Sequence, residues 1–246
     1  MRQNSNIHIM IIFETEVIAV IDRAPGVKSF KFKTDKTLTF KPGQFFFVGI
    51  MIDGQERTKH FSFSNSPTED GYIEFTKRLT SSDFSNALNQ LKPGDQAKIK
   101  APSGNFTFTG EYERIAFLSG GIGITPIRSI CRFVYDKGIS SDLVLLYGNN
   151  TEPDIIFKKD FDQMSQTNQN LKVVYTLTST DAGKDDWQGK RGYIDKIMIQ
   201  DEIPDYAVRV FYICGPPNMV SALTRLLTHD LKINSDNIVT ENFTGY

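Results

Sequence analysis

The spacing of apolar and polar residues differs between the two halves of the chain. In the first half, residues 27–33 alternate apolar and polar side chains, the period of a strand with one buried face. Segments of this kind, with turn signals between them, predict antiparallel strands at 27–33, 45–50, 72–75 and 96–101. One helix is expected at 83–91, because Ser81 and Ser82 before it are good N-cap residues. Short strands with a single helix predict a small closed β-barrel.

The second half carries unbroken apolar runs in place of alternation. Such runs are typical of parallel strands buried on both faces, and here they alternate with helical segments. The expected strands are 115–118, 143–147, 171–177 and 208–213, and the expected helices are 126–136, 155–165, 193–199 and 217–231. This alternation predicts a doubly wound α/β sheet. The change of pattern near Thr109 predicts two domains, residues 1–109 and residues 110–246.

Composition and charge exclude several classes of protein. The net charge of −1 over 246 residues disfavours nucleic acid as a partner, because binding a phosphate backbone needs an excess of clustered cations. Two distant cysteines, Cys131 and Cys214, favour neither a disulfide framework nor a metal site. The apolar run at 7–13 contains His8 and lacks a cleavage site, so it is unlike a signal peptide. No apolar run in the sequence approaches the length needed to span a membrane. The sequence therefore predicts a soluble cytoplasmic protein with no metal.

Distinctive residues follow three of the strands predicted in the second half. Ligands of open α/β sheets bind beyond the carboxyl ends of the strands, where glycines let the backbone approach a phosphate. A helix N-terminus there also attracts anions. The candidate nucleotide-binding residues are Gly121, Gly123, Thr125 and Pro126 after the first strand, Gly148 and Asn149 after the second, and Cys214, Gly215, Pro216 and Met219 after the fourth. A plain strand–helix turn and a core-filling cysteine are the alternatives.

A second candidate site lies in the first half, at Lys59-His60-Phe61-Ser62. This segment offers a cation, an aromatic face and a hydroxyl in an extended frame, a combination that suits a planar cofactor carrying phosphate. Two signals for anionic cofactors in one chain indicate that two cofactors meet. The sequence therefore favours a redox enzyme.

Four segments, in order, resemble the ferredoxin–NADP reductase superfamily of flavin- and nicotinamide-dependent reductases, over nearly the whole chain. Lys59-His60-Phe61-Ser62 occupies the place of that family's Arg-x-Tyr-Ser flavin motif. The loop from Gly121 to Pro126 resembles its nicotinamide pyrophosphate loop. Cys214-Gly215-Pro216 matches its Cys-Gly-Pro motif, and Glu241-Asn242-Phe243 resembles its C-terminal acid and aromatic.

The resemblance implies roles for residues on the flavin side. Lys59 would meet the flavin pyrophosphate, Phe61 would lie against the isoalloxazine or the ribityl chain, and Ser62 would bond the N5 region. The chain departs from the motif, since Lys59 lacks the arginine fork and Phe61 lacks the tyrosine hydroxyl. The remaining flavin-side residues that the resemblance implies are His60, Phe75, Thr76 and Lys77, with Ser81 and Ser82 at the helix N-terminus as phosphate binders.

The resemblance also bears on the choice of cofactors. FAD is favoured over FMN, because the chain continues to Phe243 and Tyr246, which would cover the ring system and the adenine respectively. For the nicotinamide nucleotide, Thr178-Ser179-Thr180 lacks the arginine that grips a 2′-phosphate in NADPH-dependent relatives. Lys190 and Arg191 lie nearby as substitutes, so NADH and NADPH both stay open.

These observations predict an FAD-dependent NAD(P)H reductase, with Ser62, Cys214 and Glu241 around the transfer site as positioning and tuning residues. Electrons would pass to a protein acceptor, such as a ferredoxin, or to a small molecule. Two alternatives stay open. One is the reductase subunit of a multicomponent oxygenase or electron-transfer complex; the other is a non-catalytic module that senses nucleotides.

Overall fold

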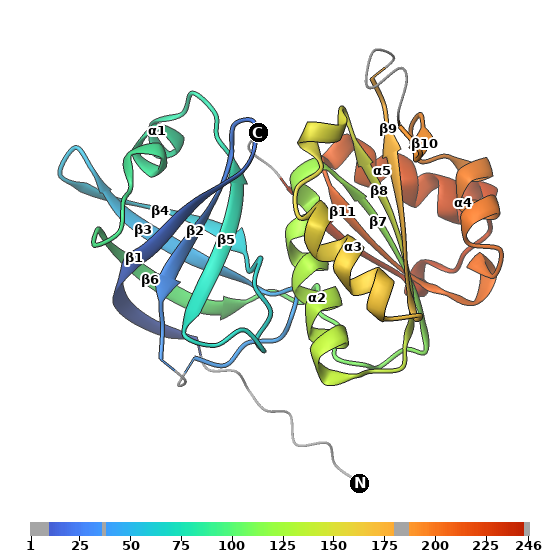
Figure 1. Cartoon of the computed structure of the whole chain (residues 1–246), viewed down its shortest axis with the longest axis horizontal. Coiled ribbons are helices and arrows are strands. Elements are labelled where there is room, and N and C mark those ends of the chain that lie inside the picture. Colours follow the sequence, from blue (N-terminus) through green and yellow to red (C-terminus); the bar gives the residue numbers. More distant parts are fainter. Residues whose placement is uncertain (1–9, 36–37, 180–186, 244–246) are drawn as a thin grey trace, which may run out of the picture.

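Six antiparallel strands and one helix build the first half of the chain. The computed structural model describes residues 10–35, 38–179 and 187–243. The strands are β1 (Ile11–Ala24), β2 (Val27–Lys33), β3 (Phe45–Ile52), β4 (Gln55–Ser62), β5 (Tyr72–Arg78) and β6 (Gln96–Ser103), and the helix is α1 (Asp83–Gln90). They form one sheet in the order β4-β3-β6-β1-β2-β5, which curls around a core of its own (Figure 1).

Phenylalanine fills this core. In β2 the alternation predicted from the sequence buries Phe30 and Phe32 completely, and Phe30 stacks on Phe75 of β5 with 5.0 Å between ring centroids. The edge strands β4 and β5 approach one another beyond the end of β4, where the Ser64 N–H donates to the Glu74 carbonyl at 2.8 Å. The predicted antiparallel β domain is therefore confirmed, but the predicted closed barrel is a half-barrel, because the ladder does not continue between the two edge strands.

The second half is a six-stranded parallel sheet in the order β10-β9-β8-β7-β11-β12. Its strands are β7 (Arg114–Gly120), β8 (Asp142–Asn149), β9 (Leu171–Leu177), β10 (Lys190–Arg191), β11 (Val210–Gly215) and β12 (Ile238–Asn242). Its helices are α2 (Ile124–Lys137), α3 (Lys158–Thr167), α4 (Lys196–Glu202) and α5 (Pro217–Arg225), which continues as a π-helical turn at Leu226–Asp230.

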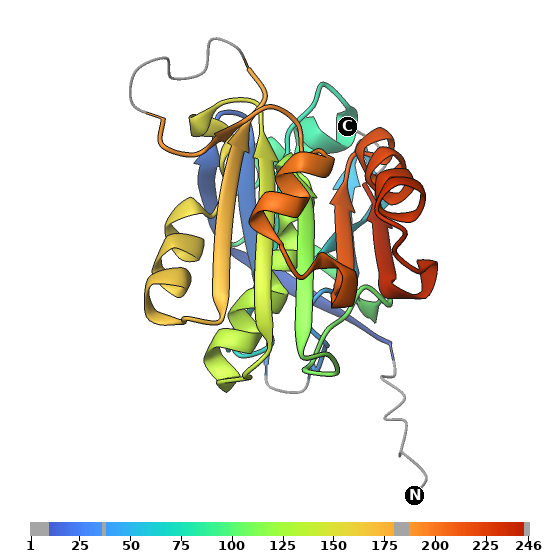
Figure 2. The same cartoon turned by 90° about the vertical axis from the view of Figure 1, so that its right-hand side faces the viewer.

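Helices cover both faces of this sheet, which confirms the predicted doubly wound domain. Apolar residues of α2 and α3 pack with one face, toward the half-barrel, and those of α4 and α5 pack with the other (Figures 1 and 2). The chain begins the sheet at β7, adds β8 and β9 on one side, and returns to place β11 on the other. The carboxyl ends of β7 and β11 thus form the switch point at which such sheets bind ligands.

Several element boundaries differ from those predicted. Helix α3 begins at Lys158 rather than at 155, because Phe157 before it has a left-handed backbone (φ 59°). Helix α4 begins at Lys196, where the Asp195 side chain accepts the Met198 N–H. Residues Tyr206–Val208 form a 3₁₀ turn, so β11 starts at Val210. The sequence prediction gave no bounds for β1, β4, β10 or the edge strand β12. In the part of the chain that the structure describes, no helix has the length and apolar character to cross a membrane.

Candidate redox site between the two sheets

Ser62, Cys214 and Glu241 come from three strands and lie together where the half-barrel meets the parallel sheet. Ser62 ends β4, and its hydroxyl donates to Glu241 Oε1 at 3.4 Å. Glu241 belongs to β12, where it pairs with Cys214 of β11, and Cys214 pairs on its other side with Ser119 of β7. A residue of the flavin-type motif therefore touches the edge strand of the other domain.

Burial sets the protonation of this group. Removal from water raises the pKa of Glu241 to about 7, although the hydrogen bond from Ser62 opposes the shift. Burial, with Glu241 beside it, also raises the pKa of the Cys214 thiol well above its usual range. Cys214 is fully buried and stays a thiol at neutral pH, so it is not a nucleophile. Glu241 can hold or release a proton near neutral pH.

The raised pKa of Glu241 predicts a pH-dependent stability. The folded chain binds this proton more tightly than the unfolded chain, in which the pKa is near 4.5. The contribution is therefore complete below about pH 4.5 and is lost as the pH rises through 7. In FAD-free protein, we expect the free energy of unfolding to fall by at most about 3 kcal/mol between pH 5 and pH 8. Urea unfolding at both pH values measures this difference, and Glu241→Gln should remove it; an equal fall in that variant would contradict the assignment.

The glycine loop after β7 packs against the end of β11. Gly123 has no room for a side chain, because a Cβ there would lie 2.4 Å from the backbone carbonyl oxygen of Cys214. Gly121 has a left-handed backbone (φ 52°), and a Cβ on it would meet no atom within 4 Å. Its backbone is therefore open to a ligand. Helix α2 starts at Ile124, two residues before Pro126, and the Thr125 hydroxyl donates to the Ile122 carbonyl at 3.3 Å.

Beyond the loop, buried polar atoms lack partners at the carboxyl ends of β7 and β8. Ser119 is completely buried and Asn149 is 5% exposed. The Ser119 hydroxyl makes no hydrogen bond to the part of the chain that the structure describes, and the Asn149 amide, which lies near the Tyr147 hydroxyl, makes no well-formed one there. Buried polar groups are rarely left unpaired, so this edge suits a ligand with its own donors and acceptors, such as a nicotinamide nucleotide. Ser119 precedes the glycine loop and was not among the predicted site residues; its signal was a hydroxyl at the end of an apolar strand.

The other candidate nucleotide residues surround the same edge. Met219, near the start of α5, lies so close to Gly120 and Gly215 that a Cβ on either would touch its thioether end. Gly148 is half-buried at the end of β8, and Pro216 is exposed after β11. The Phe243 N–H donates to the Gly215 carbonyl at 3.0 Å, which fixes the tail against this edge. Tyr246 lies outside the described residues.

On the half-barrel side, the motif residues follow the alternation of β4. Phe61 stacks on Phe75 with 4.1 Å between ring centroids and 13° between their planes. His60 is exposed and lies beside Phe45, on the other face of the strand. The Thr76 hydroxyl is buried in hydrogen bonds with Ser29 and Ser64, at 2.6 and 3.0 Å, so it stabilises the barrel.

Two lysines, one on each of the edge strands β4 and β5, form a small positive site. Lys59 is exposed and Lys77 is half-buried. Burial and the nearby charge of Lys59 lower the pKa of Lys77, so the two ammonium groups repel each other. An anion between them would relieve this repulsion. Ser82 caps α1 by accepting the Ser85 N–H at 3.3 Å, and Ser81 is exposed before it. Lys59, Lys77 and the start of α1 are therefore the candidate residues for holding the diphosphate of a flavin dinucleotide.

Comparison with known proteins gives matches to both domains. Residues 15–108 match the family described as oxidoreductase FAD-binding domain, and residues 117–225 match the oxidoreductase NAD-binding domain. The chain is 30% identical over 216 residues to the glycine betaine monooxygenase reductase subunit of Chromohalobacter salexigens, covering 85% of this chain and 58% of that protein.

Two further matches cover more of the related protein. The chain is 30% identical over 200 residues to NADH-cytochrome b5 reductase 1 of Eremothecium gossypii, covering 79% of this chain and 69% of that protein. Among solved structures, the cytochrome P450 reductase GcoB of Amycolatopsis superposes with a TM-score of 0.83 at 22% identity. That match covers 97% of this chain and 71% of the other, and at this identity it supports the fold alone.

Proposed function

Because this chain belongs to the ferredoxin–NADP reductase superfamily, we propose that it is an FAD-dependent NAD(P)H reductase. Residues 1–109 bind FAD and residues 110–246 bind the nicotinamide nucleotide. The observation that carries the proposal is the bond between Ser62 and Glu241, because it brings the flavin motif to the edge of the sheet where the nucleotide binds. The predicted family is confirmed by the family matches.

The cofactors, when bound, supply the hydride donor and its acceptor; the residues of this chain bind and orient them. The open backbone of Gly121 and the N-terminus of α2 receive the nucleotide pyrophosphate. Asn149 and Ser119 offer it side-chain atoms that have no hydrogen-bond partner in the described part of the chain. Lys59 and Lys77 receive the flavin diphosphate. Ser62 and Glu241 hold a proton at the junction, and buried Cys214 excludes water behind it.

NADH is the proposed nucleotide. A 2′-phosphate would need a free cation near the end of β9, and the Lys190 ammonium is already 2.6 Å from a Glu202 carboxylate oxygen. Thr178 donates its hydroxyl to the Asn149 carbonyl at 3.3 Å, so that residue stabilises the strand end. Neither residue offers a ready partner for the extra phosphate of NADPH. Thr180 lies outside the described residues.

An absorbance titration tests the function directly. The purified protein, or the protein reconstituted with FAD, should show the bands of oxidised flavin, and anaerobic NADH should bleach them. NADPH should bleach them about tenfold more slowly, since the Lys190 ammonium beside β9 is already paired with Glu202. A protein that takes up FAD but is not bleached by either nucleotide would contradict the reductase. One that takes up no FAD would favour the nucleotide-sensing alternative.

The acceptor is proposed to be a redox protein. The chain spans about three-fifths of the length of the glycine betaine monooxygenase reductase subunits that it resembles, and other relatives are named cytochrome b5 reductases. Reductases of this kind pass electrons to a protein partner, so the oxygenase-reductase alternative is retained as the second candidate. Reduction of a purified ferredoxin or cytochrome by NADH, dependent on this protein, would support a protein acceptor. Reduction of small quinones alone would contradict it.

A further inference from the structure

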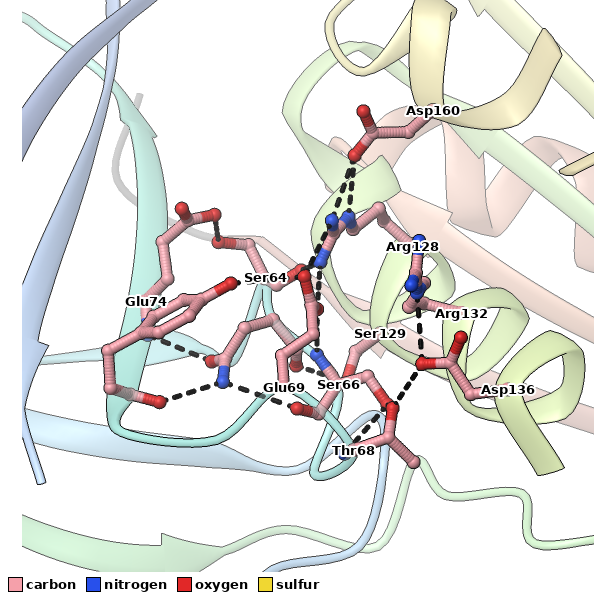
Figure 3. Close-up of polar contacts among 12 residues, drawn as sticks. Ser64, Ser66, Thr68, Glu69, Glu74, Arg128, Ser129, Arg132, Asp136 and Asp160 are labelled. Atoms are coloured by element: carbon pink, nitrogen blue, oxygen red, sulfur yellow. Dashed lines mark hydrogen bonds and ion pairs between the residues drawn. The ribbon is translucent and has the colours of Figure 1, made fainter. Parts of the chain in front are cut away.

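Arg128 joins the two domains, and every N–H of its guanidinium donates a hydrogen bond. It lies on α2, is 7% exposed, and contacts both sides of the domain interface (Figure 3). Nη1 donates to the Ser64 carbonyl at 3.0 Å and to Glu69 Oε2, and Nη2 donates to Glu69 Oε1 at 3.1 Å. Nε and Nη2 donate to Asp160 Oδ2 at 3.0 and 2.9 Å. These bonds use all five N–H donors that an arginine has.

The contacts divide by domain. Ser64 and Glu69 follow β4 in the half-barrel, whereas Asp160 lies on α3, in the same domain as Arg128. The Phe157 ring, just before α3, lies 5.4 Å from the guanidinium carbon. One half of the guanidinium thus holds the half-barrel, and the other half is held by the α/β domain.

The position of Arg128 along the chain connects the two cofactor motifs. Ser64 is two residues beyond Ser62, at the end of the flavin motif, and Arg128 is five residues beyond Gly123, one turn into the helix that the glycine loop begins. The Ser129 hydroxyl reinforces the same junction by donating to the Asn65 carbonyl at 2.7 Å. Any shift of α2 relative to the half-barrel would therefore move the nucleotide loop relative to Ser62.

We infer that Arg128 is a positioning residue, which fixes the distance between the flavin motif and the nucleotide loop through its bonds to Ser64 and Glu69. This inference rests on the proposed function for its kinetic consequence. A lysine cannot replace the arginine, because an ammonium has three donors and no planar fork. Misplacement of reacting groups by about 1 Å can slow a reaction about 100-fold, so loosening this link should affect the rate of hydride transfer more than the binding of NADH.

A matched pair of variants separates positioning from local stability. Glu69→Gln and Asp160→Asn each replace a carboxylate that pairs with the Arg128 guanidinium by a neutral amide. Only the first of these carboxylates lies in the other domain, so only Glu69→Gln weakens the link between domains. At saturating NADH, we expect the flavin bound to Glu69→Gln to be reduced about tenfold more slowly than in the parent, with an unchanged Kd for NADH. In Asp160→Asn the rate of flavin reduction should stay within about twofold of the parent. Arg128→Lys should resemble Glu69→Gln.

Calorimetry of the FAD-free proteins supplies a readout that does not need the reaction. The parent and Asp160→Asn should unfold in one sharp transition, whereas Glu69→Gln should unfold over a broader temperature range, because the coupling between the domains is weakened. Equal slowing by Glu69→Gln and Asp160→Asn, or no slowing by either, would overturn the positioning role; so would a transition in Glu69→Gln as sharp as that of the parent. If NADH fails to reduce the parent protein, the proposed function fails, while calorimetry still decides whether Arg128 couples the domains.

Discussion

Gly123→Ala should destabilise the α/β domain and weaken NADH binding more than a glycine-to-alanine change at any other position of the loop. The new Cβ would lie 2.4 Å from the Cys214 carbonyl oxygen and 2.6 Å from the Gly215 Cα, both backbone atoms of β11. Since no side chain can move aside, the loop or the strand must shift. Overpacking of this kind costs about 3 kcal/mol, which for a chain of this size lowers the Tm by roughly 10 °C. Thermal unfolding and NADH titration measure the two effects.

Gly120→Ala is the matched control for this prediction. Its Cβ would lie equally close to a neighbour, at 2.4 Å, but that neighbour is the Met219 sulfur. A thioether on a flexible side chain can rotate away, so we expect a loss below about 1 kcal/mol. If both alanine variants melt alike, the tight approach of β7 and β11 does not explain why glycine stands at position 123.

Ser62→Ala should slow the reduction of bound FAD by NADH by roughly 10- to 100-fold. The hydroxyl makes the contact with Glu241 (3.4 Å) that links the flavin motif to the nucleotide domain, and alanine cannot replace it. FAD should still bind, because Lys59 and Lys77 are untouched. Stopped-flow bleaching of the flavin bands at saturating NADH measures the rate, and the flavin absorbance of the purified variant measures retention of FAD.

Ser141→Ala provides the comparison. Ser141 is also a buried serine with a single bond, to the Tyr112 carbonyl at 2.8 Å, but it lies at the opposite, amino-terminal end of β8. Its loss should leave flavin reduction within about twofold of the parent. An unchanged rate in Ser62→Ala would remove Ser62 from the transfer site.

The fold class could be predicted because it follows from the local pattern of apolar and polar residues along the chain. Strands β2 and β9 have the predicted bounds, since alternation over most of one strand and a mainly apolar run in the other mark both clearly. Strand β12 was missed because it is short and only partly buried at the sheet edge. Its place depends on pairing with β11, which is a tertiary contact.

The candidate site could be predicted only where the sequence contained a motif. Ser62, the glycine loop and Cys214 belong to recognisable segments, and the structure brings them together, although their roles stay predictions. Arg128 had no such signal. A charged residue within an amphipathic helix resembles a solvated one, and its partner Glu69 lies 59 residues away in the other domain. Only the docking of two domains makes that arginine a buried connector.

The bond between Ser62 and Glu241 joins residues 179 positions apart, and this separation has a consequence for how the protein matures. The half-barrel and the first strands of the parallel sheet can form by pairing near neighbours. The Glu241 carboxylate reaches Ser62 only when β12 pairs with β11. Contacts between distant parts of a chain form slowly, since long loops must close first. Electron transfer would therefore be among the last properties that a newly made chain acquires.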